Sequence, residues 1–179
     1  LAALSSAASA KKYGGKRGTK QLFVVGDSLS DNGNVKRMTS GAWPVNRRAG
    51  TSDATWNEVW AYKNKFRLRN KAHYSATLDT QVKKAVTGPR DNWPVTGVVQ
   101  QIDMLYYSRQ FERCQQKKDA ECVLAIFGGG NDFTKELNKV IAVATATQAA
   151  PDFSTMGPAI ASYLDTTIAR AIEVCIYMC

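Results

Sequence analysis

Apolar runs alternate with amphipathic segments along the chain, and this alternation predicts a fold that mixes strands and helices. Residues 21–25 (QLFVV) and 122–127 (CVLAIF) are short apolar runs that each end at a glycine, which is typical of buried strands. Amphipathic segments at 96–111 and 157–174, and a third after the glycines at 128–130, predict helices. This order favours an α/β fold with a parallel sheet covered on both faces.

A further helix is predicted to begin at Thr55, because Glu58 three residues later completes a capping box. Its apolar side chains are expected to be core rather than a ligand platform; they are Trp56, Val59, Trp60 and Phe66. The other three predicted helices carry stripes at helical spacing. The stripe of the helix at 96–111 is Val98, Ile102, Leu105 and Arg109, with Tyr106 beside it. The helix after the glycines has Leu137, Val140, Ile141 and Ala144, and the helix at 157–174 has Ile160, Leu164, Ile168, Ala171 and Ile172.

The 179 residues divide into a lead-in and one domain, since the chain is too short for two comfortable cores. Residues 1–10 (LAALSSAASA) have the small side chains of a signal-peptide remnant, although a disordered Ala/Ser tail would have the same composition. Residues 11–20 form a basic, flexible lead-in, and 21–179 are the expected domain. No apolar run reaches the length of a membrane span.

The formal net charge of +9 raises the question of an anionic partner. The densest basic stretch is Lys11, Lys12, Lys16, Arg17 and Lys20. No DNA- or RNA-binding motif accompanies it, so we expect a solvated basic surface and no specific nucleic-acid partner. If the charge has a partner, anionic polysaccharide or a membrane surface suits a secreted protein better.

The four cysteines fit an oxidising compartment. Cys114 and Cys122 bracket the polar segment QQKKDAE, and either a local disulfide or two buried thiols would suit that position. Cys175 and Cys179 have no His or further Cys nearby to complete a zinc site, so no metal is expected.

Gly26-Asp27-Ser28-Leu29 carries the candidate chemistry, because a serine after a buried strand lies where open α/β sheets bind ligands. Asp27 and Ser28 would suit a helix N-cap equally well. The nucleophile elbow G-x-S-x-G does not match, since Ser30 stands in place of its second glycine, which argues against an ordinary α/β-hydrolase fold.

Several segments in order resemble one family. They are LFVVGDSLSDNGN at 22–34, GAWP at 41–44, WNEVW at 56–60, VTGVVQQIDMLY at 95–106 and FGGGNDF at 127–133. Together they are similar to the GDSL-type esterases, or SGNH hydrolases, of the secreted plant, fungal and oomycete-like branch. The resemblance covers roughly 21–170.

The resemblance implies a three-layer α/β/α sandwich with a parallel, flavodoxin-like sheet, and a serine esterase or lipase that needs no cofactor. Ser28 inherits the role of nucleophile, and its N–H that of an oxyanion donor. Asn131 inherits a second donor through its side-chain amide, although Asn131-Asp132 would also suit a purely structural loop-to-helix cap. The implied substrates are small-molecule, lipid or polysaccharide esters.

Two departures from the family pattern affect the expected activity. The third donor is expected in a block that usually reads N-x-A-x-G-G-A-T, but 70–77 here reads NKAHYSAT. Ser75 keeps an N–H, yet it is penalised if the loop needs a positive φ. The family's D-x-x-H block, the source of the base, is absent, and the only histidine is His73.

These departures lead to two hypotheses. In the first, the chain is the N-terminal part of an esterase whose fold is incomplete at its C-terminus. In the second, it is a non-catalytic secreted binding protein with the same fold. His73 is expected to pack or lie at the surface rather than replace the missing base.

Overall fold

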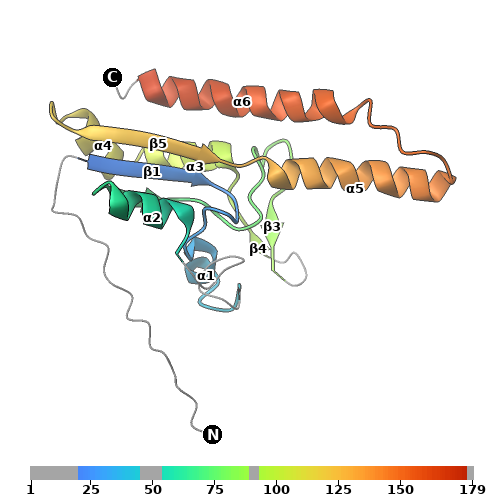
Figure 1. Ribbon diagram of the computed structural model, residues 1–179, viewed down its shortest axis with the longest axis horizontal. Helices are drawn as coiled ribbons and strands as arrows, with labels where there is room; N and C mark the ends of the chain where they lie inside the picture. The colour runs from blue at the N-terminus through green and yellow to red at the C-terminus, as the bar shows by residue number, and fades with distance from the viewer. Residues whose placement is uncertain (1–19, 45–53, 89–92, 177–179) are drawn as a thin grey trace, which may run out of the picture.

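A computed structural model of the chain describes residues 20–44, 54–88 and 93–176. Its centre is a three-stranded parallel sheet in the order β2–β1–β5 (Figure 1). Strand β1 (Lys20–Gly26) lies between β2 (Arg67–Asn70) and β5 (Glu121–Phe127). A separate antiparallel pair joins β3 (Val86–Thr87) to β4 (Trp93–Pro94). The predicted strands at 21–25 and 122–127 are therefore confirmed.

Helices cover both faces of the sheet. Helix α2 (Trp56–Lys63) packs below it, while α3 (Val98–Tyr106) and α4 (Arg109–Gln115) pack on the opposite face (Figure 1). Helix α6 (Met156–Ile176) lies over that second face, and α5 (Gly130–Thr147) continues from β5 beyond the sheet. A short helix, α1 (Asn34–Met38), follows β1. The protein is thus the α/β sandwich with a parallel sheet that the sequence predicts.

Strand β1 is the core of the molecule because both of its faces are covered. Leu22 and Val24 pack with Ala61 of α2, and Phe23 and Val25 pack with the helices opposite. All four β1 side chains are buried. Burial of each contributes about 1.5–3 kcal/mol of hydrophobic free energy.

The predicted helix at 96–111 is wrong in one respect, because the chain forms two helices there. Helix α3 ends at Tyr106, and the Ser108 side chain accepts a hydrogen bond from the N–H of Phe111, so it caps α4. The predicted stripe is buried at Val98, Ile102 and Leu105. Arg109 starts the second helix and is exposed.

The expectation that the α2 aromatics are core is also wrong for most of them. The capping box at Thr55 is present as predicted. However, Trp56 is 38% exposed and Trp60 39% exposed, and Val59 is exposed as well. Phe66 is buried, but it lies beyond the helix. The helix instead packs through small or polar residues, since its buried members are Asn57 and Ala61.

The remaining apolar runs are more exposed than the sequence predicts. Strand β5 was expected to be fully buried, but among described residues it pairs only with β1, and Ile126 and Phe127 are exposed. Four side chains of the α5 and α6 stripes are exposed too: Ile141, Leu164, Ile168 and Ile172. The physical reason is visible in Figure 1, where α5 projects past the sheet and α6 is covered on one side only.

A disulfide joins Cys114 to Cys122, with a Cα–Cα distance of 6.3 Å. It fastens the end of α4 to the start of β5, so the first of the two interpretations of this pair is confirmed. The signal-like segment, most of the basic lead-in, Cys179 and the side chain of Cys175 lie outside what the structure describes. Among the described helices, none is both long and apolar enough to span a bilayer.

Candidate active site

The candidate site lies at the edge of the sheet where the parallel strands end. Gly26, the last residue of β1, stands opposite Phe127, the last residue of β5. A Cβ on Gly26 would lie only 2.1 Å from the Phe127 carbonyl oxygen, which a side chain cannot do. With glycine there, the next N–H, that of Asp27, donates to the same oxygen at 3.1 Å. The approach of the two strands therefore requires Gly26.

Ser28 lies in a tight turn directly after this contact. The N–H groups of Ser30 and Asp31 donate to the Asp27 carbonyl at 3.1 and 3.0 Å. Ser28 is half-buried, and neither its hydroxyl nor its N–H has a hydrogen-bond partner among the described residues. The alternative interpretation as a helix N-cap is wrong, because the first helix begins at Asn34 with Gly33 at its cap position.

Asp27 connects the Ser28 turn to the start of α5. Its Oδ1 accepts the N–H of Leu29 at 3.1 Å, and its Oδ2 lies 3.8 Å from where a Cβ of Gly130 would be. Burial raises the pKa of the Asp27 carboxyl, although the Leu29 N–H stabilises the charged form. Asn131 follows Gly130, so the two predicted site residues belong to segments that meet at this edge.

Asn131 and Asp132 attach the first turn of α5 to the loop after β2. The Asn131 Nδ2 donates to the Ala76 carbonyl at 2.8 Å, and the Asp132 Oδ2 accepts the Leu78 N–H at 2.9 Å. Asp132 is fully buried, and burial raises the pKa of its carboxyl. Neither side chain caps α5, whose N-cap is Gly129 and has no side-chain cap bond. The pair instead fastens the loop that contains Ser75.

Ser75 has a φ of +64°, in the left-handed region that favours glycine. The family pattern has a glycine at this position. The loop therefore does adopt a positive φ here, and Ser75 bears the penalty that the sequence analysis described for that case. The Ser75 N–H has no partner among the described residues, and the hydroxyl lies 3.4 Å from the Thr87 Oγ1. Ser75 thus keeps a free donor in a strained backbone.

Asp31 is a structural residue that sequence reasoning missed. Its carboxylate accepts the N–H groups of Gly33, Asn34 and Val35 at 2.8, 2.6 and 3.2 Å. It also accepts the Tyr74 N–H at 2.9 Å, across 43 residues of sequence. Its position just before a short helix was a usable signal for the first three bonds. The fourth, which holds the Ser75 loop beside the Ser28 turn, has no local signature.

His73 is held between the sheet edge and the start of α3. Its backbone N–H donates to the Gly26 carbonyl at 3.1 Å. Its ring Nδ1 lies 2.7 Å from the Thr96 Oγ1 and 3.3 Å from the Thr96 backbone nitrogen. Burial is the main cause that lowers the pKa of the imidazole, and the nearby Asp31 carboxylate opposes this shift. These contacts support the packing role expected for His73.

Gln101 is a second residue that sequence reasoning missed. It is fully buried on α3, where its amide accepts the Gly26 N–H at 2.7 Å and donates to the Gly26 carbonyl at 3.0 Å. A signal was present, because Gln101 lies on the same helix face as Val98 and Leu105. A polar residue within a buried stripe needs internal hydrogen bonds.

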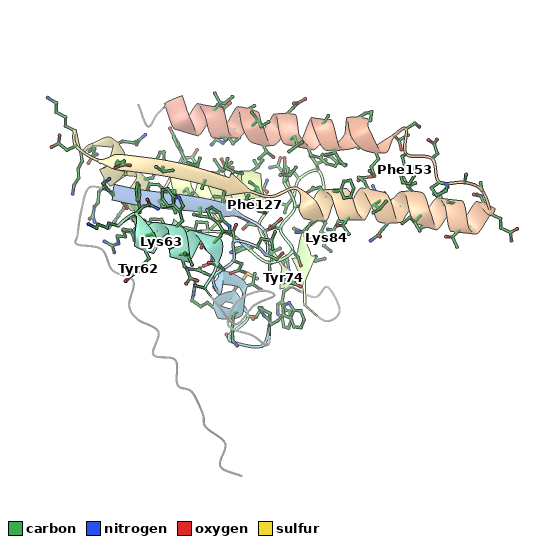
Figure 2. The ribbon with its side chains drawn as sticks, viewed as in Figure 1. Tyr62, Lys63, Tyr74, Lys84, Phe127 and Phe153 are labelled. Carbon is green, nitrogen blue, oxygen red and sulfur yellow. A yellow bond between two sulfur atoms is a disulfide. The ribbon has the colours of Figure 1, made fainter. Side chains whose placement is uncertain are left out.

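Apolar side chains surround the Ser28 turn. The Trp56 ring lies 6.2 Å from the Phe127 ring, and its Nε1–H donates to the Ser30 hydroxyl at 3.0 Å. Phe127 is 47% exposed and Leu29 is 61% exposed. Figure 2 shows Phe127 where β5 passes into α5. An exposed apolar group beside a polar edge can receive the apolar part of a ligand.

We predict that Ser75→Gly stabilises the protein by about 1 kcal/mol. Glycine removes a left-handed penalty of about 1–2 kcal/mol at the cost of roughly 0.5–1 kcal/mol of backbone entropy. Urea unfolding measures the change. Ser75→Ala is the control, because it removes the hydroxyl and keeps the strained Cβ. Equal stability of the two variants would contradict the assignment of strain.

We also predict that the free energy of unfolding falls as the pH drops below about 6.5, where an ordinary histidine takes up its proton. Since the folded pKa of His73 is lowered, the unfolded chain binds this proton first, and stability rises with pH across that window. His73→Asn should remove this contribution, because asparagine keeps an acceptor and does not titrate, while the opposite contributions of Asp27 and Asp132, whose folded pKa values are raised, remain. The chain has one histidine, so an unchanged slope in the variant would refute the prediction.

Comparison with known proteins identifies the family of the chain. The model of the family described as GDSL-like lipase/acylhydrolase matches residues 22–176, which include Ser28, Ser75 and Asn131. A search of curated proteins finds no match. Because the matched range covers most of the 179 residues, the chain belongs to the GDSL-like lipase/acylhydrolase family, a family of ester hydrolases.

Proposed function

We propose that this protein hydrolyses carboxylic esters through an acyl intermediate on Ser28. One observation carries the proposal. The Ser28 hydroxyl and N–H are unpaired among the described residues, on a turn at the carboxyl edge of the sheet, within the family's GDSL segment. Open α/β sheets bind their ligands at this edge.

The proposed first step is attack of the Ser28 oxygen on the ester carbonyl. The carbonyl oxygen then becomes negatively charged, and donors must already point towards it. We assign this role to the N–H groups of Ser28 and Ser75 and to the Asn131 side-chain amide, whose second hydrogen is not needed for Ala76. Each such donor typically contributes a factor of ~10²–10³ in rate. The alcohol then leaves, and water hydrolyses the acyl-serine.

The serine hydroxyl needs a base, because it is a weak nucleophile at neutral pH. The 179 residues contain no D-x-x-H, and the Nδ1 of His73 is bonded to Thr96. Without its histidine, a serine hydrolase retains only the ~10³–10⁴-fold advantage over water that oxyanion donors and binding supply. Free imidazole is therefore a suitable probe, since it can act as the missing base.

The surroundings of Ser28 favour an ester with an apolar acyl group over a carbohydrate acetate. Leu29, Trp56 and Phe127 expose apolar surface around the turn. Burial of such surface by an acyl chain contributes about 25 cal/mol per Å². We further propose that the protein is secreted, which the disulfide between Cys114 and Cys122 supports.

The first test compares the chain with Ser28→Ala on p-nitrophenyl butyrate, with and without imidazole. We expect imidazole to accelerate hydrolysis above the rate with imidazole alone, and Ser28→Ala to abolish this protein-dependent part. The protein-free blank is essential, because imidazole itself cleaves activated esters. Equal rates for the two proteins would reject serine catalysis and favour the non-catalytic binding protein.

The second test concerns the apolar acyl group. Trp56→Ala should reduce the preference for p-nitrophenyl octanoate over the acetate by about tenfold, since ~1.4 kcal/mol of contact is lost. Trp60→Ala is a matched control, because Trp60 lies on the same helix with almost the same exposure and packs on Phe66 instead. The ratio of the two esters cancels differences in folded fraction. A similar loss in both variants would argue against a role of Trp56 in binding.

A further inference from the structure

We propose that Gln101 is a positioning residue that fixes the nucleophile turn, and that it does so as part of a closed ring of hydrogen bonds with Gly26, Thr96 and His73. This inference rests on the proposed function, because it assigns a role in the reaction of Ser28. Its physical core, the clamp on Gly26, can be tested without any activity.

The first support is that strand pairing on one side of β1 ends before Gly26. The last partner of β1 in β2 is Asn70, opposite Val24. The Gln101 amide takes over at Gly26, where it accepts the N–H at 2.7 Å and donates to the carbonyl at 3.0 Å. A primary amide has the same donor and acceptor as a peptide group, so the side chain supplies the acceptor that a neighbouring strand would offer to the Gly26 N–H, and it shares the Gly26 carbonyl with the backbone N–H of His73.

The second support is that the hydrogen bonds close on themselves. The Gln101 Nε2 also donates to the Thr96 carbonyl at 3.0 Å. The hydroxyl and the backbone N–H of Thr96 both contact the His73 Nδ1. The backbone N–H of His73 donates to the Gly26 carbonyl at 3.1 Å, which closes the ring. Both donor hydrogens of the Gln101 amide are used, in a side chain with no exposed surface. Rotation of the Gly26 peptide would break several buried bonds at once.

The ring matters for the reaction because it joins the two segments that supply backbone donors. Ser28 lies two residues after Gly26, and Ser75 lies two residues after His73. The spacing between their N–H groups therefore depends on the ring. A displacement of about 1 Å in such an arrangement can cost ~10²-fold in rate.

Gln100 provides a matched control on the same helix. Its amide makes two hydrogen bonds where that of Gln101 makes three: it accepts the Thr80 N–H at 3.0 Å and donates to the Asp79 Oδ1 at 2.6 Å, with none to Gly26. Methionine is similar in shape to glutamine and cannot make these bonds. Gln100→Met thus removes amide hydrogen bonds from the same helix and leaves Gly26 untouched, whereas Gln101→Met removes the clamp.

The test that needs no activity is amide hydrogen exchange followed by NMR. We expect Gln101→Met to lower the protection of the Gly26 amide relative to that of Phe23 by at least about tenfold, the equivalent of one lost hydrogen bond of ~1.4 kcal/mol. Gln100→Met should leave this ratio unchanged. An unchanged ratio in Gln101→Met would overturn the clamp.

The second measurement is the Ser28-dependent, imidazole-stimulated rate. We expect Gln101→Met to lower kcat by ~10²-fold with little change in KM, because binding surfaces such as Trp56 are untouched. A loss no larger than that of Gln100→Met would show that Gln101 is merely structural. If the unmodified protein shows no Ser28-dependent rate, the proposed function fails, whereas the exchange result still decides on the clamp.

If Gln101→Met does not fold, Gln101→Glu replaces it in both measurements. Its carboxylate still accepts the Gly26 N–H but cannot donate to the carbonyl groups of Gly26 and Thr96. We expect a smaller loss of kcat and of Gly26 protection, which is partly restored when acid protonates the carboxyl. Full activity and full protection in Gln101→Glu at neutral pH would refute the role of the donated bonds.

Discussion

The site depends on the close approach of the end of β1 to the end of β5. The Phe127 carbonyl oxygen lies in the space that a Cβ of Gly26 would fill, and it accepts the next N–H of the chain. This contact turns the chain sharply at Asp27 and leaves Ser28 at the sheet edge. An alanine at Gly26 would push the strands apart, and the Ser28 turn and the start of α5 would no longer meet. The geometry of the candidate site therefore depends on the absence of a side chain at Gly26.

Sequence reasoning succeeded where the signal is local. An apolar run that ends in glycine predicted β1, and the Thr55–Glu58 pair predicted the start of α2, because strand burial and capping depend on neighbouring residues. It failed where packing decides. The exposure of Trp56 and Trp60 depends on which face of α2 packs against the sheet. The apolar spacing of residues 157–174 predicts a helix, but it does not show that α6 is covered on one side only.

The candidate site divides in the same way. The motif residues Ser28, Ser75 and Asn131 were predicted from the resemblance, and the structure brings their segments to one edge of the sheet. The residues that hold those segments were not predicted. Asp31 reaches across 43 residues to Tyr74, and Gln101 reaches across 75 to Gly26, so both contacts exist only in the folded chain. A polar residue within an apolar stripe predicts that its side chain makes an internal hydrogen bond, but the sequence does not identify the residue at the other end of that bond.

The same long-range bonds explain how the loop tolerates Ser75 in place of glycine. A left-handed serine costs about 1–2 kcal/mol, and such strain persists only where the surroundings fix the backbone on both sides. Before Ser75, the Tyr74 N–H is held by Asp31. After it, the Ala76 carbonyl is held by Asn131 and the Leu78 N–H by Asp132. The loop geometry is therefore imposed by its neighbours rather than by its own sequence, so the departure from the glycine pattern costs stability and leaves the direction of the Ser75 N–H in place.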